Sequence, residues 1–274
     1  MENILLIINP DKPGLASIDF ACNVATSAQA RLTGVFIENF YFEYIPIGDA
    51  MAPAYFGQLQ ENSQVKADTD QAVRIFQEEC QRKGIIPEVY VDKGEPIQEV
   101  IYESRFADLV IIDPYMNFYE REEDAPSHFA REILAHAECP VLIAPEKFES
   151  IEEIIFCYDG SASSLFAIKL FTYLFPAFSK KNVMLLEISK SDSEQVDESH
   201  KRIMQWLGSH YNDVHYHALK GDVKDELFTW FFMKEKKLIV MGAYGRPLLS
   251  RFFNKSAADV LIRMVDLPIF ITHH

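Results

Sequence analysis

The sequence predicts an α/β fold of two tandem, doubly wound parallel five-stranded sheets with flanking helices, a Rossmann-like arrangement. Short runs rich in Val, Ile and Leu alternate with segments whose apolar residues recur at helical spacing. These runs lack the alternation of apolar and polar residues that is typical of a sheet with one wet face. We therefore expect a parallel sheet that is buried on both faces. The whole pattern occurs twice, which predicts two similar units.

Each half begins with a β-rich run, Ile4–Asn9 or Ile154–Tyr158, followed by a polar turn. A helix is expected next, because apolar residues then recur every three or four positions. These residues are Ile18, Ala21, Cys22 and Ala25 in the first half, and Phe166, Leu170, Tyr173 and Leu174 in the second. The later strands correspond between the halves in the same order: Leu32–Ile37 with Val183–Ile188, Glu88–Asp92 with His215–Leu219, Ala107–Ile112 with Lys237–Met241, and Cys139–Ala144 with Leu267–Thr272.

The repeat divides the chain into residues 1–147 and residues 148–274. Gly94 and Gly221 are 127 positions apart, whereas the offset is nearer 148 across the first strands. The first half therefore carries about twenty additional residues, which we place within 40–65. Two interpretations of this insertion stay open: an ordered excursion that packs its own aromatic side chains, or a surface flap that binds a partner.

The net charge of −15 is concentrated in the first half, where residues 1–147 carry −14 and residues 148–274 carry −1. This excess of negative charge argues against nucleic acid or an anionic membrane as a partner. The apolar runs are far shorter than the roughly 18 residues that a membrane span requires, and the N-terminus lacks the charged leader of a signal peptide.

The cysteines have no paired spacing in the sequence. They are Cys22, Cys80, Cys139 and Cys157. This distribution favours packing thiols in a reducing compartment over a disulfide framework or a zinc site. We expect a cytoplasmic protein.

The loop after the fourth strand of the second half combines features that hold a polyphosphate. Gly242 and Gly245 let backbone amides approach a ligand closely. A helix that begins near Ser256 directs amide donors and a partial positive charge to the same place. The cations in this loop are Arg246, Arg251 and Lys255. The spacing of the two glycines alone also fits a plain turn, so a turn without a ligand stays open as the alternative to a phosphate site.

The stretch from Gly242 to Ser256 resembles the signature of the universal stress protein family, Gly-x2-Gly-x9-Gly-[Ser/Thr]. Both glycines, the nine-residue spacer and the final serine match, whereas Lys255 stands where the pattern has glycine. Tyr158–Ser161 resembles the end of the family's first strand. The strands that follow Pro140 and Pro268 resemble its last strand, so the resemblance covers essentially the whole chain, once in each half.

The resemblance implies a site for ATP, with or without Mg²⁺, or for a related adenine nucleotide. Its expected residues are Asp159, Gly160, Gly242, Gly245, Arg246, Lys255 and Ser256. Asp159 would contact the adenosine part, the later glycines would present amides, and Ser256 would donate its hydroxyl to phosphate. Two questions stay open: whether Lys255 pairs with the phosphates or fills their space, and whether Asp159 or Ser161 caps the following helix.

The first half lacks these features. Its fourth strand ends at Asp113, where the second half has Gly242, and five acids but only one arginine occupy the loop 113–124. Asp11 is the candidate counterpart of Asp159. We expect this half to be degenerate and to serve a structural or partner-binding role; a divalent metal in the acidic loop is the alternative.

No catalytic motif is evident, so we expect no enzyme beyond a slow incidental ATPase. No metal site is expected either, because His215 and His217 share one strand face without a third ligand. The predicted function is that of a stress-response protein that binds ATP or a related adenine nucleotide in its second half. It would act as a nucleotide-sensing or interaction module for an unknown protein partner.

Resemblance to the family's dimers implies an intramolecular pseudo-dimer with the last strands near its two-fold axis, and further association into a homodimer stays open. The alternative function is a scaffold that binds no nucleotide, has two degenerate sites and recruits a protein partner. An ATP-cleaving nucleotidyl transferase is a third, weaker reading, because no catalytic metal ligands stand out.

Overall fold

The computed structural model describes residues 1–39, 44–47, 50–53, 63–118, 122–189, 198–221, 223–243 and 255–272. Gly245 and Arg246 lie outside these residues, and the backbone but not the side chains of Lys255 and Ser256 is described. The side chains of the insertion expected within 40–65 are likewise outside the description up to residue 64.

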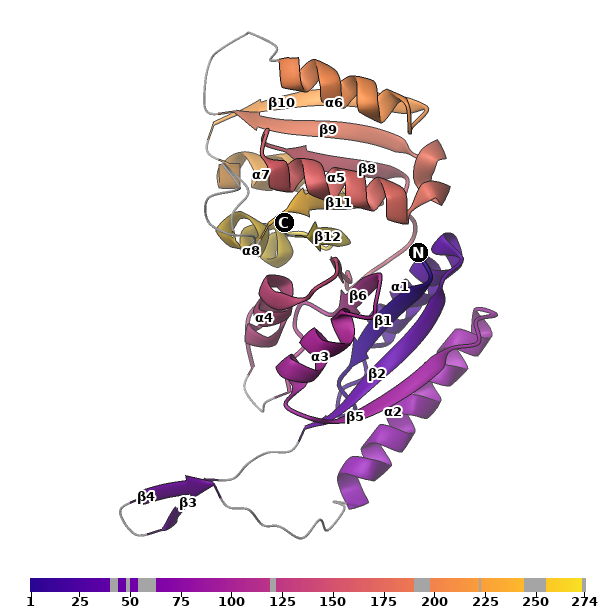
Figure 1. The fold of residues 1–274 in the computed structure, drawn as a ribbon, viewed down its shortest axis with the longest axis vertical. Helices are drawn as coiled ribbons and strands as arrows, with labels where there is room; N and C mark the ends of the chain where they lie inside the picture. Colours follow the sequence, from indigo (N-terminus) through magenta and orange to yellow (C-terminus); the bar gives the residue numbers. More distant parts are fainter. Residues whose placement is uncertain are drawn as a thin grey trace.

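Ten strands form one continuous sheet (Figure 1). The first half contributes, in spatial order, β5 (Glu88–Gly94), β2 (Arg31–Asn39), β1 (Asn3–Ile8), β6 (Leu109–Ile112) and β7 (Val141–Ile143). The second half contributes β10 (Asp213–Lys220), β9 (Asn182–Ser189), β8 (Glu153–Tyr158), β11 (Lys237–Gly242) and β12 (Ile269–Thr272). Both halves thus have the same order, with their third, second, first, fourth and fifth sheet strands side by side. The doubly wound α/β prediction is confirmed.

The two halves meet where β7 pairs with β12. This pairing is antiparallel, with Phe270 opposite Leu142, whereas the other neighbours in the large sheet are parallel. The two five-stranded units are therefore one ten-stranded sheet. The expected pseudo-dimer with central last strands is confirmed.

The helices form two layers, one on each face of the sheet. One layer contains α1 (Leu15–Ala28), α2 (Ser63–Arg82), α5 (Ala162–Leu174), a 3₁₀ turn η1 (Pro176–Lys180) and α6 (Glu198–Gly208). The other layer contains α3 (Pro96–Ser104), α4 (His128–His136), α7 (Val223–Phe231) and α8 (Lys255–Met264). The start of α8 agrees with the helix expected near Ser256.

The first strand explains why the sequence shows no polar alternation. Ile4, Leu6 and Ile8 pack into the core beneath α1 and α2, whereas Leu5 and Ile7 pack into the core on the opposite face. Every residue from Ile4 to Ile8 is at most 4% exposed. Successive side chains of a strand point to opposite faces, so a strand covered on both faces needs apolar residues at consecutive positions.

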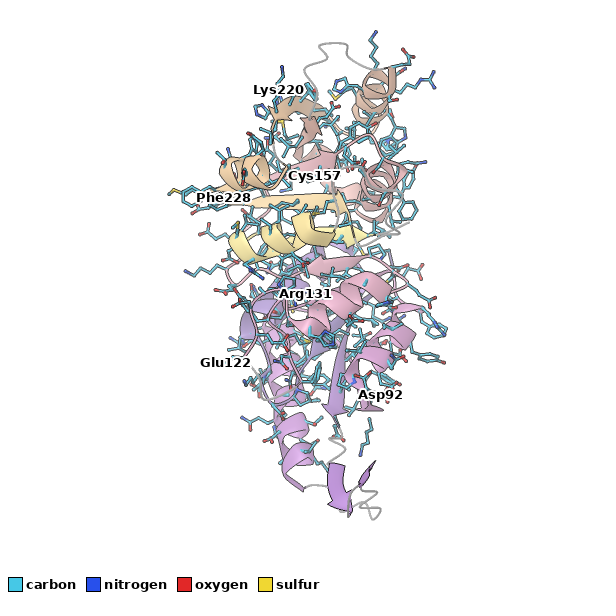
Figure 2. The ribbon with its side chains drawn as sticks, turned by 90° about the vertical axis from the view of Figure 1, so that its left-hand side faces the viewer. Asp92, Glu122, Arg131, Cys157, Lys220 and Phe228 are labelled. Atoms are coloured by element: carbon cyan, nitrogen blue, oxygen red, sulfur yellow. The ribbon has the colours of Figure 1, made fainter. Side chains whose placement is uncertain are left out.

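Side-chain contacts also cross the seam between the halves. The fully buried Phe270 of β12 lies opposite Leu142 of β7, and both belong to one apolar core; within the second half its ring packs edge-on against Phe171, with ring centroids 5.2 Å apart. Arg131 of α4, labelled at the level where the halves meet in Figure 2, forms an ion pair of 3.5 Å with Asp259 of α8. The seam therefore combines a shared apolar core with polar contacts.

The insertion of the first half contains a hairpin of β3 (Tyr44–Ile47) and β4 (Ala50–Pro53). It forms a separate two-stranded antiparallel sheet, which lies apart from the large sheet in Figure 1. Within the described residues, no helix combines the length and the apolar character needed to cross a bilayer.

Two cysteines that are far apart in the sequence are in contact. The sulfur atoms of Cys22 in α1 and Cys80 in α2 are 3.5 Å apart, and both residues are fully buried. Burial raises the pKa of the Cys139 thiol to about 12, as expected of a packing thiol. The sequence interpretation missed the Cys22–Cys80 pair because 58 positions separate the two residues.

Candidate functional site

Both halves place a loop at the point where the strand order reverses, which is where ligands of open α/β sheets bind. Ile4 lies opposite Leu109 in the first half, and Ile154 lies opposite Leu238 in the second. Counting forward from these pairs, Asp113 corresponds to Gly242, as expected from the sequence.

The same register makes Asn9, and not Asp11, the counterpart of Asp159. The proposed match of Asp11 was therefore wrong. The turn between Asn9 and the N-cap Gly14 is three residues longer than the turn between Asp159 and the N-cap Ser161. Asp11 thus lies two residues beyond Asn9, the position that matches Asp159.

Asp159 follows β8 directly and is only 6% exposed. Its Oδ1 accepts a hydrogen bond of 3.0 Å from the backbone amide of Ser161. The Ser161 hydroxyl accepts from the amide of Ser164 at 3.1 Å, so Ser161 is the residue that caps α5. Gly160 between them has a φ of +75°, which a side chain would strain. Asp159 is therefore held at the strand end by the loop and is not the helix cap.

Gly242 ends β11, the strand next to β8. A Cβ atom at Gly242 would lie 2.4 Å from the carbonyl oxygen of Ser163 in the first turn of α5. The glycine thus allows the helix backbone to pack directly on the strand. This close packing is a structural reason for the glycine, independent of any ligand.

The hydroxyl of Ser163 lies at the same point and is buried. Within the part of the chain that the structure describes, Ser163 Oγ has no hydrogen-bond partner. An unpaired buried hydroxyl costs free energy, and such groups are rare in native proteins. A hydroxyl donor, a carboxylate and the nearby start of α5 are groups that suit sugar hydroxyls and phosphate oxygens. The described residues of the second half therefore offer groups that can hydrogen-bond hydroxyl and phosphate oxygens of a ligand.

In the first half, the carboxylate of Asp113 lies against the start of α1. Its Oδ2 accepts a hydrogen bond of 3.2 Å from the Ser17 hydroxyl, and its Oδ1 accepts one of 2.7 Å from the Tyr115 amide. Gly14 caps α1 without a side-chain hydrogen bond, and a Cβ there would lie 3.5 Å from Asp113 Oδ2. Burial raises the pKa of Asp113, although the bonds from Tyr115 and Ser17 oppose the rise. The protein's own carboxylate thus occupies the helix end where an anionic ligand would bind.

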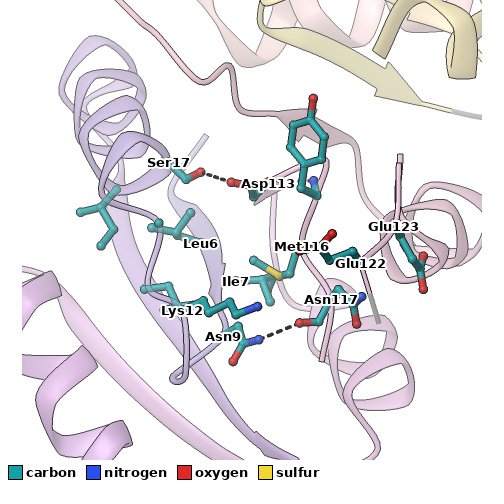
Figure 3. A pocket seen from close by; sticks show the side chains of 14 residues that line it. Leu6, Ile7, Asn9, Lys12, Ser17, Asp113, Met116, Asn117, Glu122 and Glu123 are labelled. Carbon is teal, nitrogen blue, oxygen red and sulfur yellow. Dashed lines mark hydrogen bonds between the residues drawn. The ribbon is translucent and has the colours of Figure 1, made fainter. Parts of the chain in front are cut away.

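A cavity of about 410 Å³ opens beside Asp113 (Figure 3). It lies at the carboxyl ends of β1 and β6, and Asn9 in its wall donates a hydrogen bond of 2.7 Å to the Asn117 carbonyl. The sequence interpretation singled out neither Asn9 nor Ser17. The signal that could have found Asn9 is its place directly after the run Ile4–Ile8, which matches the place of Asp159 directly after Ile154–Tyr158.

The other sequence candidates are not assembled into a site. His215 faces Asp213 at 3.1 Å, whereas the ring of His217 lies 6.0 Å from that of Trp230. Among the residues described, no group of three or more His, Cys, Asp or Glu side chains could hold a metal ion.

Comparisons with known proteins agree with this architecture. No protein-family model matches the chain, and no curated protein matches it significantly. A universal stress protein from Archaeoglobus fulgidus superposes with a TM-score of 0.68 at 14% identity and covers 98% of this chain and 98% of that chain. A putative universal stress protein from Pseudomonas aeruginosa UCBPP-PA14 gives a TM-score of 0.64 at 15% identity, with 100% and 93% covered. A protein of unknown function from Pseudomonas aeruginosa PAO1 gives 0.62 at 14% identity, with 100% and 92% covered. The chain has the fold of the tandem universal stress proteins.

Proposed function

We propose that this chain is a universal stress protein of two domains, residues 1–147 and 148–274, which binds ATP or a related adenine nucleotide in the second. The observation that carries the proposal is the buried hydroxyl of Ser163, which lies beside Gly242 and has no hydrogen-bond partner among the described residues. A ligand oxygen near this hydroxyl would give it the acceptor that the described residues do not provide.

The residues have separate roles in this proposal. Asp159 accepts hydrogen bonds from the ribose hydroxyls, and the next residue, Gly160, adopts a positive φ that favours glycine. Gly242, Gly245 and the start of α8 at Lys255 and Ser256 present donors to the phosphates. Arg246 and the ammonium of Lys255 balance the phosphate charge, which Mg²⁺ would reduce further.

Nucleotide occupancy, and not turnover, is the signal in this proposal. No residue is assigned to activate a water molecule, so hydrolysis is expected only as a slow side reaction. Four or five charge-assisted contacts, less the cost of association, correspond to binding in roughly the micromolar range. A protein partner would distinguish the occupied from the empty form.

Calorimetry with ATP and Mg²⁺ tests the proposal. Ser163→Ala removes the unpaired hydroxyl, so we expect it to leave stability unchanged or higher but to weaken ATP binding by roughly 10-fold or more. Ser199→Ala, in an exposed position of α6, is the matched control and should bind as wild type does. Asp159→Ala should also weaken binding.

A flat titration of the wild-type protein at high micromolar ATP would favour the second candidate, a scaffold that recruits a protein without nucleotide. The observation in favour of the scaffold is that Asp113 already fills the anion position in the first half. If neither half can bind a nucleotide, the function must depend on a protein partner that binds the surface.

A further inference from the structure

The cavity of the first half is large enough for a small molecule. Its volume of about 410 Å³ falls within the range of ligand pockets, about 300–1,000 Å³. Ile8, Ile18 and Met116 contribute apolar surface, and the labelled side chains in Figure 3 come from β1, the turn that follows it, α1 and the segment after β6. Small-molecule sites typically combine such walls with a few convergent polar groups.

The charged groups that line the cavity are predominantly anionic. Asp113, Glu122 and Glu123 contribute carboxylates, and Lys12 contributes the one ammonium among the described residues that line it. Glu123 accepts a hydrogen bond from the amide of His128 at the start of α4, so its charge is committed to that helix. The charges left for a ligand are those of Asp113 and Glu122, opposed by Lys12.

Within the part of the chain that the structure describes, Asp113 is a partly buried carboxylate without a counter-ion. Its hydrogen bonds come from a hydroxyl and an amide, and within the described ranges it forms no ion pair, not even with Lys12. Burial of a charge without an opposite charge is unfavourable. A cation placed in the cavity beside this carboxylate would remove that cost and gain a charge-assisted hydrogen bond.

We propose that the first-half cavity binds a small organic ammonium compound, with Asp113 as its counter-ion and the apolar wall in contact with its carbon skeleton. A metal ion is disfavoured, because the described residues contain no cluster of three metal-ligating side chains. A phosphate is disfavoured because Asp113 occupies the start of α1. The inference does not rest on nucleotide binding in the second half.

Titrations of the ¹⁵N-labelled full-length protein with matched probes test this site. The probes are tyramine, which is cationic, 4-ethylphenol, which is neutral, and 4-hydroxyphenylacetate, which is anionic; benzylamine and 1,5-diaminopentane add two other cation shapes. We expect at least one amine to shift the amide signals of Gly14 and Asn117 in a saturable manner. The neutral and anionic analogues should bind at least 10-fold more weakly.

Variants identify the counter-ion. Asp113→Asn keeps an acceptor for Ser17 or Tyr115 and should weaken amine binding roughly 10- to 100-fold. Glu122→Gln, at an exposed position, should weaken it several-fold without affecting the fold. Glu138→Gln removes an equal charge from an exposed ion pair with Arg105, away from the cavity, and should have no effect.

The proposal is overturned if none of the three amines shifts these signals, if the uncharged analogues bind equally well, or if both cavity variants bind amines as wild type does. Failure of nucleotide binding is read separately, because ATP should shift the signals of Asp159 and Gly242 instead.

Discussion

Gly242 offers a direct test of how tightly the second half is packed. A Cβ atom at this position would lie 2.4 Å from the oxygen and 2.5 Å from the carbon of the Ser163 carbonyl. Carbon–oxygen contacts in proteins are normally about 3.3 Å or longer, so Gly242→Ala requires a displacement of about 1 Å. Both atoms belong to the backbone of α5, and a side-chain rotation cannot provide the space.

The expected cost follows from this displacement. Overpacking of a well-packed core typically costs about 1–3 kcal/mol. In a chain of this size, each kcal/mol lowers the midpoint of thermal unfolding by about 2 °C, so we expect a decrease of about 2–6 °C. Urea denaturation should show the same loss in the free energy of unfolding with no ligand present.

Gly208→Ala is the matched control. Gly208 ends α6, and a Cβ there would meet no atom within 4 Å. Alanine is favoured over glycine in helices, so this variant should be unchanged or more stable by up to about 1 kcal/mol. A Gly242→Ala protein within 0.5 kcal/mol of wild type would refute the packing argument and leave ligand approach as the reason for the glycine.

Three further predictions concern charge, thiols and the seam. Because burial raises the pKa of Asp113, the native state binds its proton more tightly than the unfolded chain does. Asp113→Asn should therefore raise the thermal midpoint at pH 7, and the gain should vanish below the ordinary aspartate pKa of about 3.9. A less stable variant at pH 7 would contradict this. Diamide, which takes up two electrons and two protons, should convert Cys22 and Cys80 to a disulfide. The readout is the loss of two titratable thiols, which should not occur in Cys80→Ser. Retention of all four thiols would count against this prediction. Phe270→Ala should lower the free energy of unfolding by about 3–5 kcal/mol in urea, because its ring is fully buried at the seam; a loss below 2 kcal/mol would show that the seam repacks.

Much of the fold follows from local patterns. The apolar run Ile4–Ile8 predicts a strand covered on both faces, and the repeat predicts a second one at Ile154–Tyr158. The start of α8 follows from the change to helical periodicity after residue 255. The antiparallel pairing of β7 with β12 could not be obtained from periodicity, and it was expected only through resemblance to known dimers.

The site was less predictable, because its features depend on contacts between distant segments. The sequence marks Gly242 as conformationally permissive, but it does not show that Ser163, 79 positions earlier, packs against it. The wrong match of Asp11 to Asp159 also arose because the sequence does not show which residues of distant strands lie opposite each other. Turn length varies at little cost in energy, so residue type is a poor guide to register when the turns differ by three residues.

In the two proposals above, the residue at the end of the fourth strand decides which charge each half accepts. A glycine there lets α5 pack against β11, where the Ser163 hydroxyl has no acceptor among the described residues, which favours a ligand rich in acceptors. Asp113, at the same position in the first half, supplies an acceptor from the protein itself and therefore needs a positive partner instead. Because the flanking strands have the same order and register in both halves, this exchange does not require a change in the sheet. Duplication thus permits one fold to present two switch points of opposite electrostatic preference.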